Sequence, residues 1–248
     1  MATAVLISGG LDSAVLLAEE AARGLVQPIY VRAGLSWEES ERLALDRLLA
    51  QAAFHRVRGL VTLDVDMRDV YAATHWAVQG RPPAYDTPDE EVYLPGRNVV
   101  LLGKTAVYCA AVGLGRIVLG TLGHNPFPDA TPEFRAAMAR ALSIGLAHEL
   151  VVEAPYAALD KADVVRRGVR LGVPLESTLS CMNPRRRPPR AEETACPGPA
   201  LDVLHCGACS KCRERHDAFL QAGVPDPTEY ADRMFVESGL TPHARRPR

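Results

Sequence analysis

The sequence is short of net charge, of lysine and of long apolar runs. Its 28 basic and 30 acidic residues leave a formal net charge of −2. No global positive field would therefore draw the chain to nucleic acid or to an anionic membrane. No apolar run approaches the roughly 18 residues that a membrane-spanning helix needs. Lysine occurs only at Lys104, Lys161 and Lys211, so any lysine that binds phosphate must be one of these.

The first residues also lack the marks of an export signal. Residues 1–7 carry no basic flank and lead directly into Ser8-Gly9-Gly10. We therefore expect a cytoplasmic protein without membrane partners, held in a reducing compartment. In such a compartment the six cysteines are expected to be metal ligands or buried thiols rather than disulfides.

Short apolar runs alternate with helical patterns along the first two-thirds of the chain. The apolar runs predict five strands, at residues 3–7, 26–31, 60–65, 117–120 and 150–154. Helices are expected at residues 11–23, 36–53, 98–113, 131–147 and 160–170. This alternation predicts an α/β fold with a doubly wound, mainly parallel five-stranded sheet. Ligands of such sheets bind beyond the carboxyl ends of the strands.

Local signals predict where these helices begin and where the pattern is interrupted. Residues 36–39 have the spacing of a capping box, and three further helix starts are expected at Asn98, Thr131 and Asp160. Residues 66–97 contain several prolines and acids, which is typical of a long loop or lid-like insertion. Residues 182–204 are rich in arginine and proline, which predicts a mobile insertion.

The segment Ser8-Gly9-Gly10-Leu11-Asp12-Ser13 follows the first strand and opens the first helix. Two glycines let backbone N–H groups converge on an anion, and the helix N-terminus adds partial positive charge. The hydroxyls of Ser8 and Ser13 can donate hydrogen bonds to phosphate oxygens. The loop has no lysine, so it differs from the Walker loop. We favour a phosphate-binding loop over an ordinary glycine turn, because both serines and Asp12 accompany the glycines.

A second group of residues has the spacing of a metal site, at Cys206, Cys209 and Cys212. A fourth ligand would close a tetrahedral site of the kind that holds structural zinc. We favour Cys181 because it ends a structured segment, and Cys196 and His205 are rival ligands. The alternative is a cluster of buried free thiols. Cys109 lies within an apolar helix and is expected to be a core residue.

The phosphate loop is the signature of the PP-loop ATP pyrophosphatases, and further segments narrow the resemblance. From about residue 5 to residue 230 the chain resembles the 7-cyano-7-deazaguanine synthase family. The segments that carry the resemblance after the loop are 95–98, 120–121, 127–134, 160–163, 180–181, 205–215 and 222–230. The resemblance implies an adenine-nucleotide α-hydrolase-like ATP-binding domain over residues 1–178. It also implies a zinc-binding region over residues 179–230 and a tail over 231–248.

The family resemblance also implies a reaction. That family converts 7-carboxy-7-deazaguanine and ammonia into a nitrile for queuosine, a modified base of tRNA. The carboxylate is adenylated by ATP, with Mg²⁺, and ammonia displaces AMP to give an amide. The amide oxygen is then activated in the same way and lost. A homodimer that acts on small molecules, without direct contact to nucleic acid, is implied as well.

Residue roles follow from the resemblance and from position. The phosphate loop, Ser8 to Ser13, would hold the pyrophosphate end of ATP. Three further residues are expected at the nucleotide, Tyr30, Arg32 and Gly120. Arg97 and Lys161 are candidate cations for the charge that develops on the phosphates. Zinc would be held by Cys181, Cys206, Cys209 and Cys212.

Two features depart from the family pattern: the segment Asn125 to Thr131, and the stretch of twenty-four residues from Met182 to His205, which is longer than expected for the family. The family usually has Cys and Arg where this chain has Ala130 and Thr131, and the missing arginine removes a bidentate carboxylate clamp. Asp129 is kept, and we expect it to recognise the guanine-like edge of the substrate or to support the turn before the next helix. Two other functions therefore stay open. The chain could be a PP-loop ligase that joins a deazapurine carboxylate to a different amine, or an inactive nucleotide-binding relative.

Overall fold

The computed structural model describes residues 2–123, 125–188 and 203–234. Five parallel strands form the central sheet, in the order β3-β2-β1-β4-β5. Their bounds are β1 Thr3–Leu6, β2 Val26–Arg32, β3 Val61–Asp64, β4 Arg116–Val118 and β5 Val151–Glu153. The order reverses beside β1, so the carboxyl ends of β1 and β4 flank the point where such sheets bind ligands. The fold class predicted from the sequence is confirmed.

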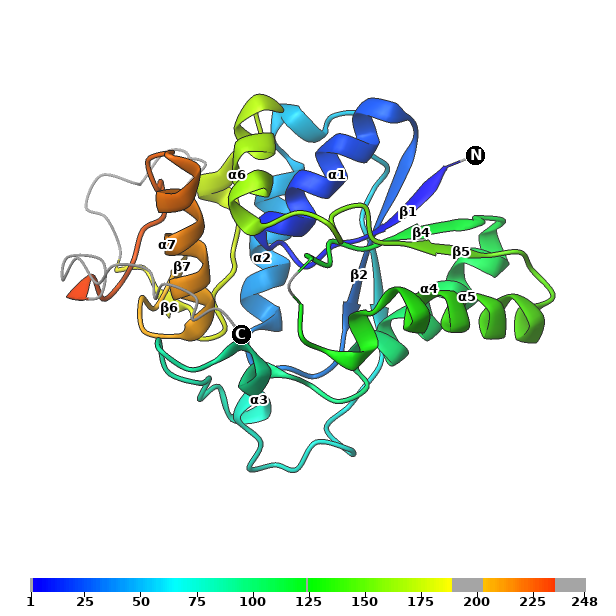
Figure 1. Cartoon of the computed structure of the whole chain (residues 1–248), viewed down its shortest axis with the longest axis horizontal. Helices are drawn as coiled ribbons and strands as arrows, with labels where there is room; N and C mark the ends of the chain where they lie inside the picture. Colours follow the sequence, from blue (N-terminus) through cyan, green and yellow to red (C-terminus); the bar gives the residue numbers. More distant parts are fainter. Residues whose placement is uncertain (1, 124, 189–202, 235–248) are drawn as a thin grey trace.

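Helices cover both faces of this sheet (Figure 1). One face packs against α1 (Leu11–Arg23), α2 (Glu38–Leu49) and α6 (Lys161–Arg170). The other face packs against α4 (Arg97–Val112) and α5 (Pro132–Leu146). Cys109 of α4 is fully buried in this second layer, as expected of a core residue. The sheet is therefore doubly wound, because the crossovers from β1 to β3 pass over one face and those from β3 to β5 pass over the other.

Of the four predicted helix caps, two are confirmed and two are wrong. Thr131 accepts a hydrogen bond from the backbone of Phe134, and Asp160 accepts one from Asp163, so both cap their helices. The Ser36 capping box is absent, because α2 begins at Glu38 without a side-chain cap. The Glu38 carboxylate instead accepts the backbone N–H groups of Ala33 and Gly34.

The helix expected after Asn98 begins one residue before it, at Arg97. The backbone N–H of Asn98 donates to Asp129, so a side chain from a distant loop satisfies this helix start. Asn98 is therefore the second residue of the helix and does not cap it.

The remaining segments pack together beside the carboxyl edge of the sheet. Residues 66–97 contain α3 (Trp76–Gln79) and a short 3₁₀ helix over Asp89–Val92. Their buried side chains share one apolar cluster with the four cysteines, and α7 (Ser210–Ala222) packs against α6. The ends of the 182–204 stretch pair as an antiparallel ribbon, β6 (Arg185–Arg186) with β7 (Val203–Leu204). Cys196 and most of the 231–248 tail lie outside the described residues.

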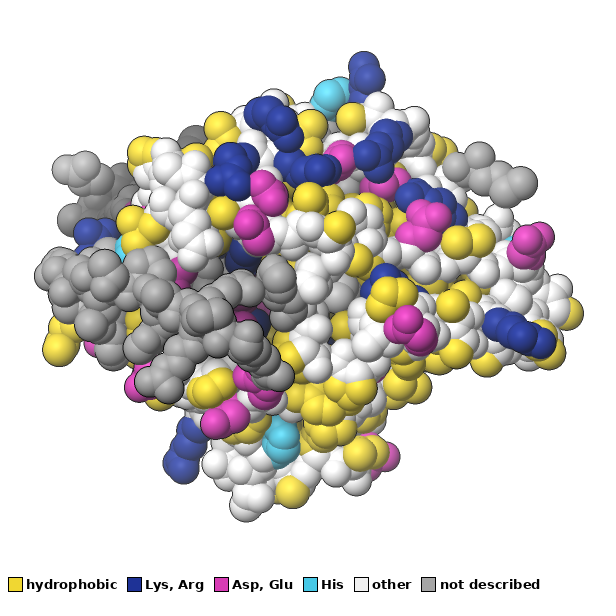
Figure 2. All heavy atoms as spheres, viewed as in Figure 1, with side chains coloured by type: hydrophobic (Ala, Val, Ile, Leu, Met, Phe, Trp, Pro, Cys, Tyr) yellow, Lys and Arg dark blue, Asp and Glu magenta, His cyan; other side chains and the backbone are white. Residues whose placement is uncertain are grey.

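The surface is mixed in charge, in keeping with the composition. In Figure 2, basic and acidic side chains lie interspersed over the upper part of the face shown. Among the described residues, no helix is long and apolar enough to cross a membrane.

Candidate active site

The phosphate loop forms a closed turn between β1 and α1. Gly9 has a φ of 78°, and a Cβ built on it would lie 3.3 Å from the Leu45 side chain. The Ser13 hydroxyl donates to the Gly10 carbonyl at 3.0 Å and accepts the Ser8 backbone N–H at 3.2 Å. α1 starts after Gly10 with no side-chain cap, so its first N–H groups face the loop opening. This is the arrangement that an anion-binding helix start requires.

Two cavities adjoin this loop. The larger has a volume of about 440 Å³ and the smaller about 250 Å³. Both are lined by the loop and by the segment after β4, through Ser8, Gly10, Asp12, Gly120, Thr121, Asn125 and Phe127. A Cβ on Gly120 would lie 3.4 Å from the Ser13 nitrogen, so the segment after β4 packs closely against the start of α1.

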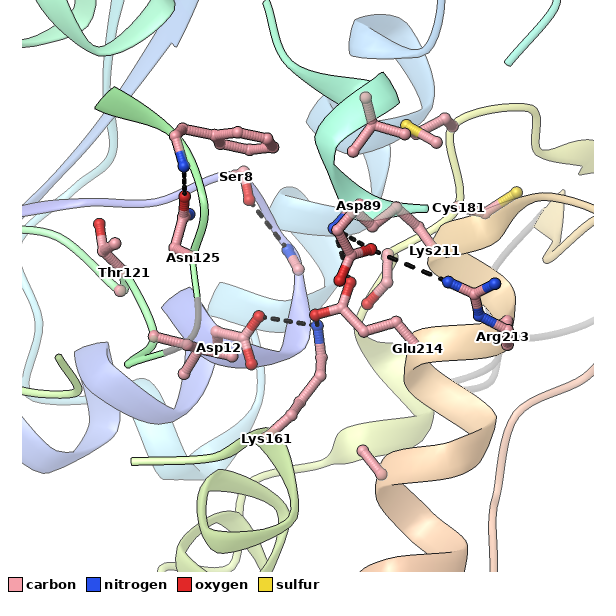
Figure 3. A pocket seen from close by; sticks show the side chains of 18 of the residues that line it. Ser8, Asp12, Asp89, Thr121, Asn125, Lys161, Cys181, Lys211, Arg213 and Glu214 are labelled. Atoms are coloured by element: carbon pink, nitrogen blue, oxygen red, sulfur yellow. Dashed lines mark hydrogen bonds and ion pairs between the residues drawn. The ribbon is translucent and has the colours of Figure 1, made fainter. Parts of the chain in front are cut away.

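Lys161 lies in the larger cavity, between two acids from different elements. Its Nζ is 3.0 Å from Asp12 Oδ2 and 2.9 Å from Glu214 Oε1, and Figure 3 shows the three side chains pointing toward one another. Burial opposes the charge of Lys161, but Asp12 and Glu214 outweigh this and raise the lysine pKa above its ordinary value. Lys161 is therefore a cation held at the mouth of the phosphate loop.

Helix α7 brings further charged residues to the same cavity. Burial works to raise the pKa of Glu214, but Lys161 and Lys211 lower it below its ordinary value. The Lys211 Nζ is 2.7 Å from Glu214. Arg213 donates to the Thr87 carbonyl at 3.0 Å and lies 4.0 Å from Asp89. Lys211 is one of three candidate phosphate lysines, whereas no local signal indicates a role for Arg213 or Glu214, although both directly follow Cys212.

Arg97 and Tyr30 occupy the wall where the two cavities meet. Arg97 lines both cavities, and its buried Nε has no hydrogen-bond partner among the described residues. The Tyr30 hydroxyl donates to Glu41 Oε2 at 2.8 Å, and burial followed by the charge of Glu41 raises the tyrosine pKa. Sequence reasoning missed Glu41, because nothing local distinguishes it from the other acids of α2.

Two expected site residues have their own partners. Asp129 lines the smaller cavity, and its carboxylate accepts the Asn98 backbone N–H at 2.9 Å. Arg32 pairs with Asp64 at 2.7 Å on the surface, and neither described cavity includes it. The structure thus brings Lys161, Arg97 and Asp129 to the loop and leaves Arg32 outside the cavities.

The four cysteines favoured as ligands come together in one buried cluster. The sulfur atoms of Cys181, Cys206, Cys209 and Cys212 all lie within 4.8 Å of one another, so the group could hold a metal ion. The Cys181 sulfur accepts backbone N–H groups of Asn183 and Cys206, which stabilise a thiolate. His205 is turned elsewhere, since its Nε2 accepts the Ser180 N–H at 3.1 Å.

The fold and site together define a doubly wound α/β protein with a glycine-rich loop at the start of α1 and a buried four-cysteine cluster beside that loop. The family model described as "Queuosine biosynthesis protein QueC" matches residues 2–223. The chain belongs to the QueC family, and its function lies in queuosine biosynthesis.

Three of its relatives share one name. Proteins named 7-cyano-7-deazaguanine synthase are 34% identical in Anaeromyxobacter dehalogenans, 33% in Xanthomonas campestris pv. campestris and 31% in Thermoplasma volcanium. Each alignment covers 92% of this chain, and 94%, 96% and 90% of the respective relative. Among solved structures, phosphoadenylyl-sulfate (PAPS) reductase from Candida auris matches with a TM-score of 0.37 at 12% identity. That match covers 70% of this chain and 73% of the reductase, and it is too weak to bear on function.

Proposed function

We propose that this chain converts 7-carboxy-7-deazaguanine and ammonia into 7-cyano-7-deazaguanine, with ATP used once to form an amide and once to form the nitrile. The observation that carries the proposal is the meeting of Lys161, Arg97 and the phosphate loop around one pair of cavities, in a member of the QueC family. Cations beside a helix start stabilise the charge that builds on phosphates during adenylation.

The triphosphate would lie across the phosphate loop, with the adenosine in the smaller cavity. Tyr30 and Gly120 line that cavity, which supports their assignment to the nucleotide. Lys161 would approach the pyrophosphate that leaves. Asp12 Oδ1 is buried without a hydrogen-bond partner among the described residues, and a carboxylate oxygen of this kind suits Mg²⁺. When bound, Mg²⁺ would neutralise phosphate charge.

The acid substrate would lie in the larger cavity, beside the Pα of ATP. The rings of Trp37 and Trp76 line this cavity and stack with centroids 5.8 Å apart. They provide a flat apolar wall for a purine-like ring. Recognition of the guanine-like edge by Asp129 stays a prediction, and it requires the base to reach into the smaller cavity, where Asp129 lies. Its Oδ2 is engaged by the Asn98 N–H, while Oδ1 has only a long contact of 3.4 Å to the Asn98 amide.

The cysteine cluster is proposed to hold one structural zinc ion. Four thiolates leave no open position on a tetrahedral ion, so zinc would support the fold and take no part in the reaction. Cys209 is the N-cap residue of α7 and Cys212 lies in its first turn, so the ion would fix the helix that carries Lys211, Arg213 and Glu214. The cytoplasmic location, the homodimer, the division into domains and the absence of nucleic-acid contact stay predictions.

A ligase with a different amine acceptor is the second candidate. It is favoured by residues 130 and 131, where the family usually has Cys and Arg. Thr131 replaces the arginine, and its hydroxyl accepts the Phe134 N–H at 3.1 Å and so caps α5. One assay separates the candidates. The chain is incubated with ATP, 7-carboxy-7-deazaguanine and ammonia, and AMP, pyrophosphate and products are followed by mass spectrometry.

Under the proposed function the assay yields the nitrile and two AMP for each nitrile formed. If the acid is adenylated but neither amide nor nitrile forms with ammonia, and a product forms with a different amine, the second candidate is supported. Absence of AMP and pyrophosphate with every amine tested indicates an inactive nucleotide-binding relative.

A further inference from the structure

Glu41 is a buried acid in the wall of the larger cavity, and none of the roles described above uses it. It belongs to the first turn of α2 and is 7% exposed. Its closest partner is the hydroxyl of Tyr30, at 2.8 Å. Tyr30 lines the smaller cavity, so this hydrogen bond joins the nucleotide side of the site to the substrate side.

Four groups face the Glu41 carboxyl and set its protonation. Burial raises its pKa, and the charge of Arg97 from α4 and hydrogen bonds from Tyr30 of β2 and from Trp37 oppose this. Glu38, on the same helix, raises the pKa further, and the net effect brings the pKa of Glu41 to about 7. A base with such a pKa takes up protons near neutral pH without holding them too tightly.

Three other acids that line the larger cavity already have partners of their own. Asp12 and Glu214 share Lys161, and Figure 3 shows both turned toward its ammonium group. Asp160 accepts the backbone N–H at the start of α6. A nearby cation or a donated N–H stabilises the ionised form of a carboxylate and weakens it as a base.

The proposed reaction must release protons from nitrogen. When ammonia attacks the acyl adenylate, the C–N bond forms, the C–O bond to AMP breaks and one N–H proton must leave. When the amide oxygen attacks Pα, pyrophosphate leaves. The two protons on that nitrogen must then be lost as AMP departs and the C≡N bond forms. Each round therefore needs a proton acceptor beside the nitrogen, on the substrate side of the phosphate loop.

We propose that Glu41 is this proton acceptor, with Tyr30 positioning its carboxylate from the nucleotide side. The inference rests on the proposed function and assigns the residue that serves the nitrogen steps. Adenylation of the carboxylate releases no N–H proton, so it does not depend on Glu41. The two halves of the reaction should therefore respond differently to the same substitution.

The test measures two steps separately in the full chain. ATP–pyrophosphate exchange with 7-carboxy-7-deazaguanine alone reports adenylation. Amide formation is followed in a single turnover, with the concentration of free NH₃ held constant from about pH 6 to about pH 9. We expect wild-type amide formation to rise with pH around a midpoint near 7, while exchange shows no such rise.

Glu41→Gln should keep exchange within about twofold and lose about 10²- to 10⁴-fold in amide formation, together with the rise near pH 7. Glu39→Gln, an exposed acid of the same helix, is the matched control and should match the wild type in both steps. Tyr30→Phe gives an independent reading. Its hydroxyl lowers the pKa of Glu41, so its removal should move the midpoint of amide formation to higher pH.

Three results would overturn the inference. Glu41→Gln could form the amide at the wild-type rate, both steps could fall equally, or Tyr30→Phe could leave the midpoint in place. The pH dependence of amide formation in Tyr30→Phe tests the role of Glu41 even if Glu41→Gln fails to fold. Absence of exchange in the wild type, by contrast, counts against the proposed function itself, and this inference then falls with it.

Discussion

The backbone N–H of Leu179 donates a 2.8 Å hydrogen bond to the carbonyl oxygen of Gly9. This contact ties the phosphate loop to the segment that carries Cys181, only two residues further on. Arg215 fixes the same segment from α7, since its buried guanidinium donates to Thr178 and to the Leu175 carbonyl. The cysteine cluster and the phosphate loop thus share one structural support.

Loss of the metal should therefore affect nucleotide binding through the fold. We expect one zinc ion per chain by elemental analysis, and Cys181→Ser should lose it. The variant should show a lower melting temperature and weaker ATP affinity, because the Leu179 contact to Gly9 is no longer held in place. Cys196→Ser is the matched control and should keep both metal and stability. Zinc lost from Cys196→Ser and kept by Cys181→Ser would show that the ligand set is wrong.

Lys161→Met should reduce both turnover and stability. The substitution removes the cation shared by Asp12 and Glu214, and breaking a buried ion pair costs on the order of 3 kcal/mol. Loss of a cation at the leaving pyrophosphate should lower the adenylation rate by about 10²-fold or more. Lys104→Met, at an exposed position of α4, serves as the control. Normal pyrophosphate exchange in Lys161→Met would contradict the role given to this lysine.

The raised pKa of Glu41 also predicts how stability depends on pH. Because the folded state raises this pKa from 4.5 to about 7, the protonated acid is favoured. Its contribution is complete below pH 4.5 and is lost as pH rises through 7. One pKa unit corresponds to about 1.4 kcal/mol, so ionisation of Glu41 costs about 3 kcal/mol of stability.

Glu41→Gln removes this cost and should therefore melt at a higher temperature than the wild type above pH 7. The difference should shrink toward pH 5, where the wild-type acid is protonated. Thermal unfolding of both proteins across this range, without ligands, checks the prediction. A variant that is less stable than the wild type at high pH would show that Glu41 contributes favourable charge interactions instead.

Local pattern was enough to predict the sheet, most helices, the phosphate loop and the grouping of Cys181 with the later cysteines. Strand periodicity, a glycine pair after β1 and a regular cysteine spacing are each visible within a few neighbouring residues. The capping box at Ser36 shows the limit of such signals. Glu39 has the right spacing for it, yet α2 begins at Glu38 without a side-chain cap, and the Glu38 carboxylate accepts the N–H groups of the preceding turn.

The contacts that organise the site join residues far apart in the sequence. Lys161 and Glu214 are 53 positions apart, and Asn98 and Asp129 are 31 apart. Nothing in the local sequence indicates that α7 reaches the phosphate loop, because that depends on how α7 packs against α6 and how the cysteine cluster packs against residues 66–97. The nucleotide-binding role expected of Arg32 depends on a distant residue in the same way. Its neighbour on β3 is Asp64, and the two side chains form an ion pair on the surface.

The last prediction concerns Asp129, for which two roles can be separated by the choice of substitution. Asparagine keeps an oxygen that can accept the Asn98 N–H, so Asp129→Asn preserves the start of α4 but removes the charge. A guanine-like edge presents paired donors that a carboxylate accepts better than an amide does. We therefore expect Asp129→Asn to lose affinity for 7-carboxy-7-deazaguanine while it keeps its affinity for ATP, both measured by calorimetry.

Asp129→Ala and Thr131→Ala complete the comparison. Alanine at 129 leaves the Asn98 N–H without its partner, which should cost about 1–3 kcal/mol of stability. Thr131→Ala removes the neighbouring cap of α5 at a cost of about 1 kcal/mol and should leave base affinity unchanged, because the hydroxyl serves only that helix. If Asp129→Asn binds the base as well as the wild type does while Asp129→Ala is unstable, the acid supports the start of α4 and does not read the substrate.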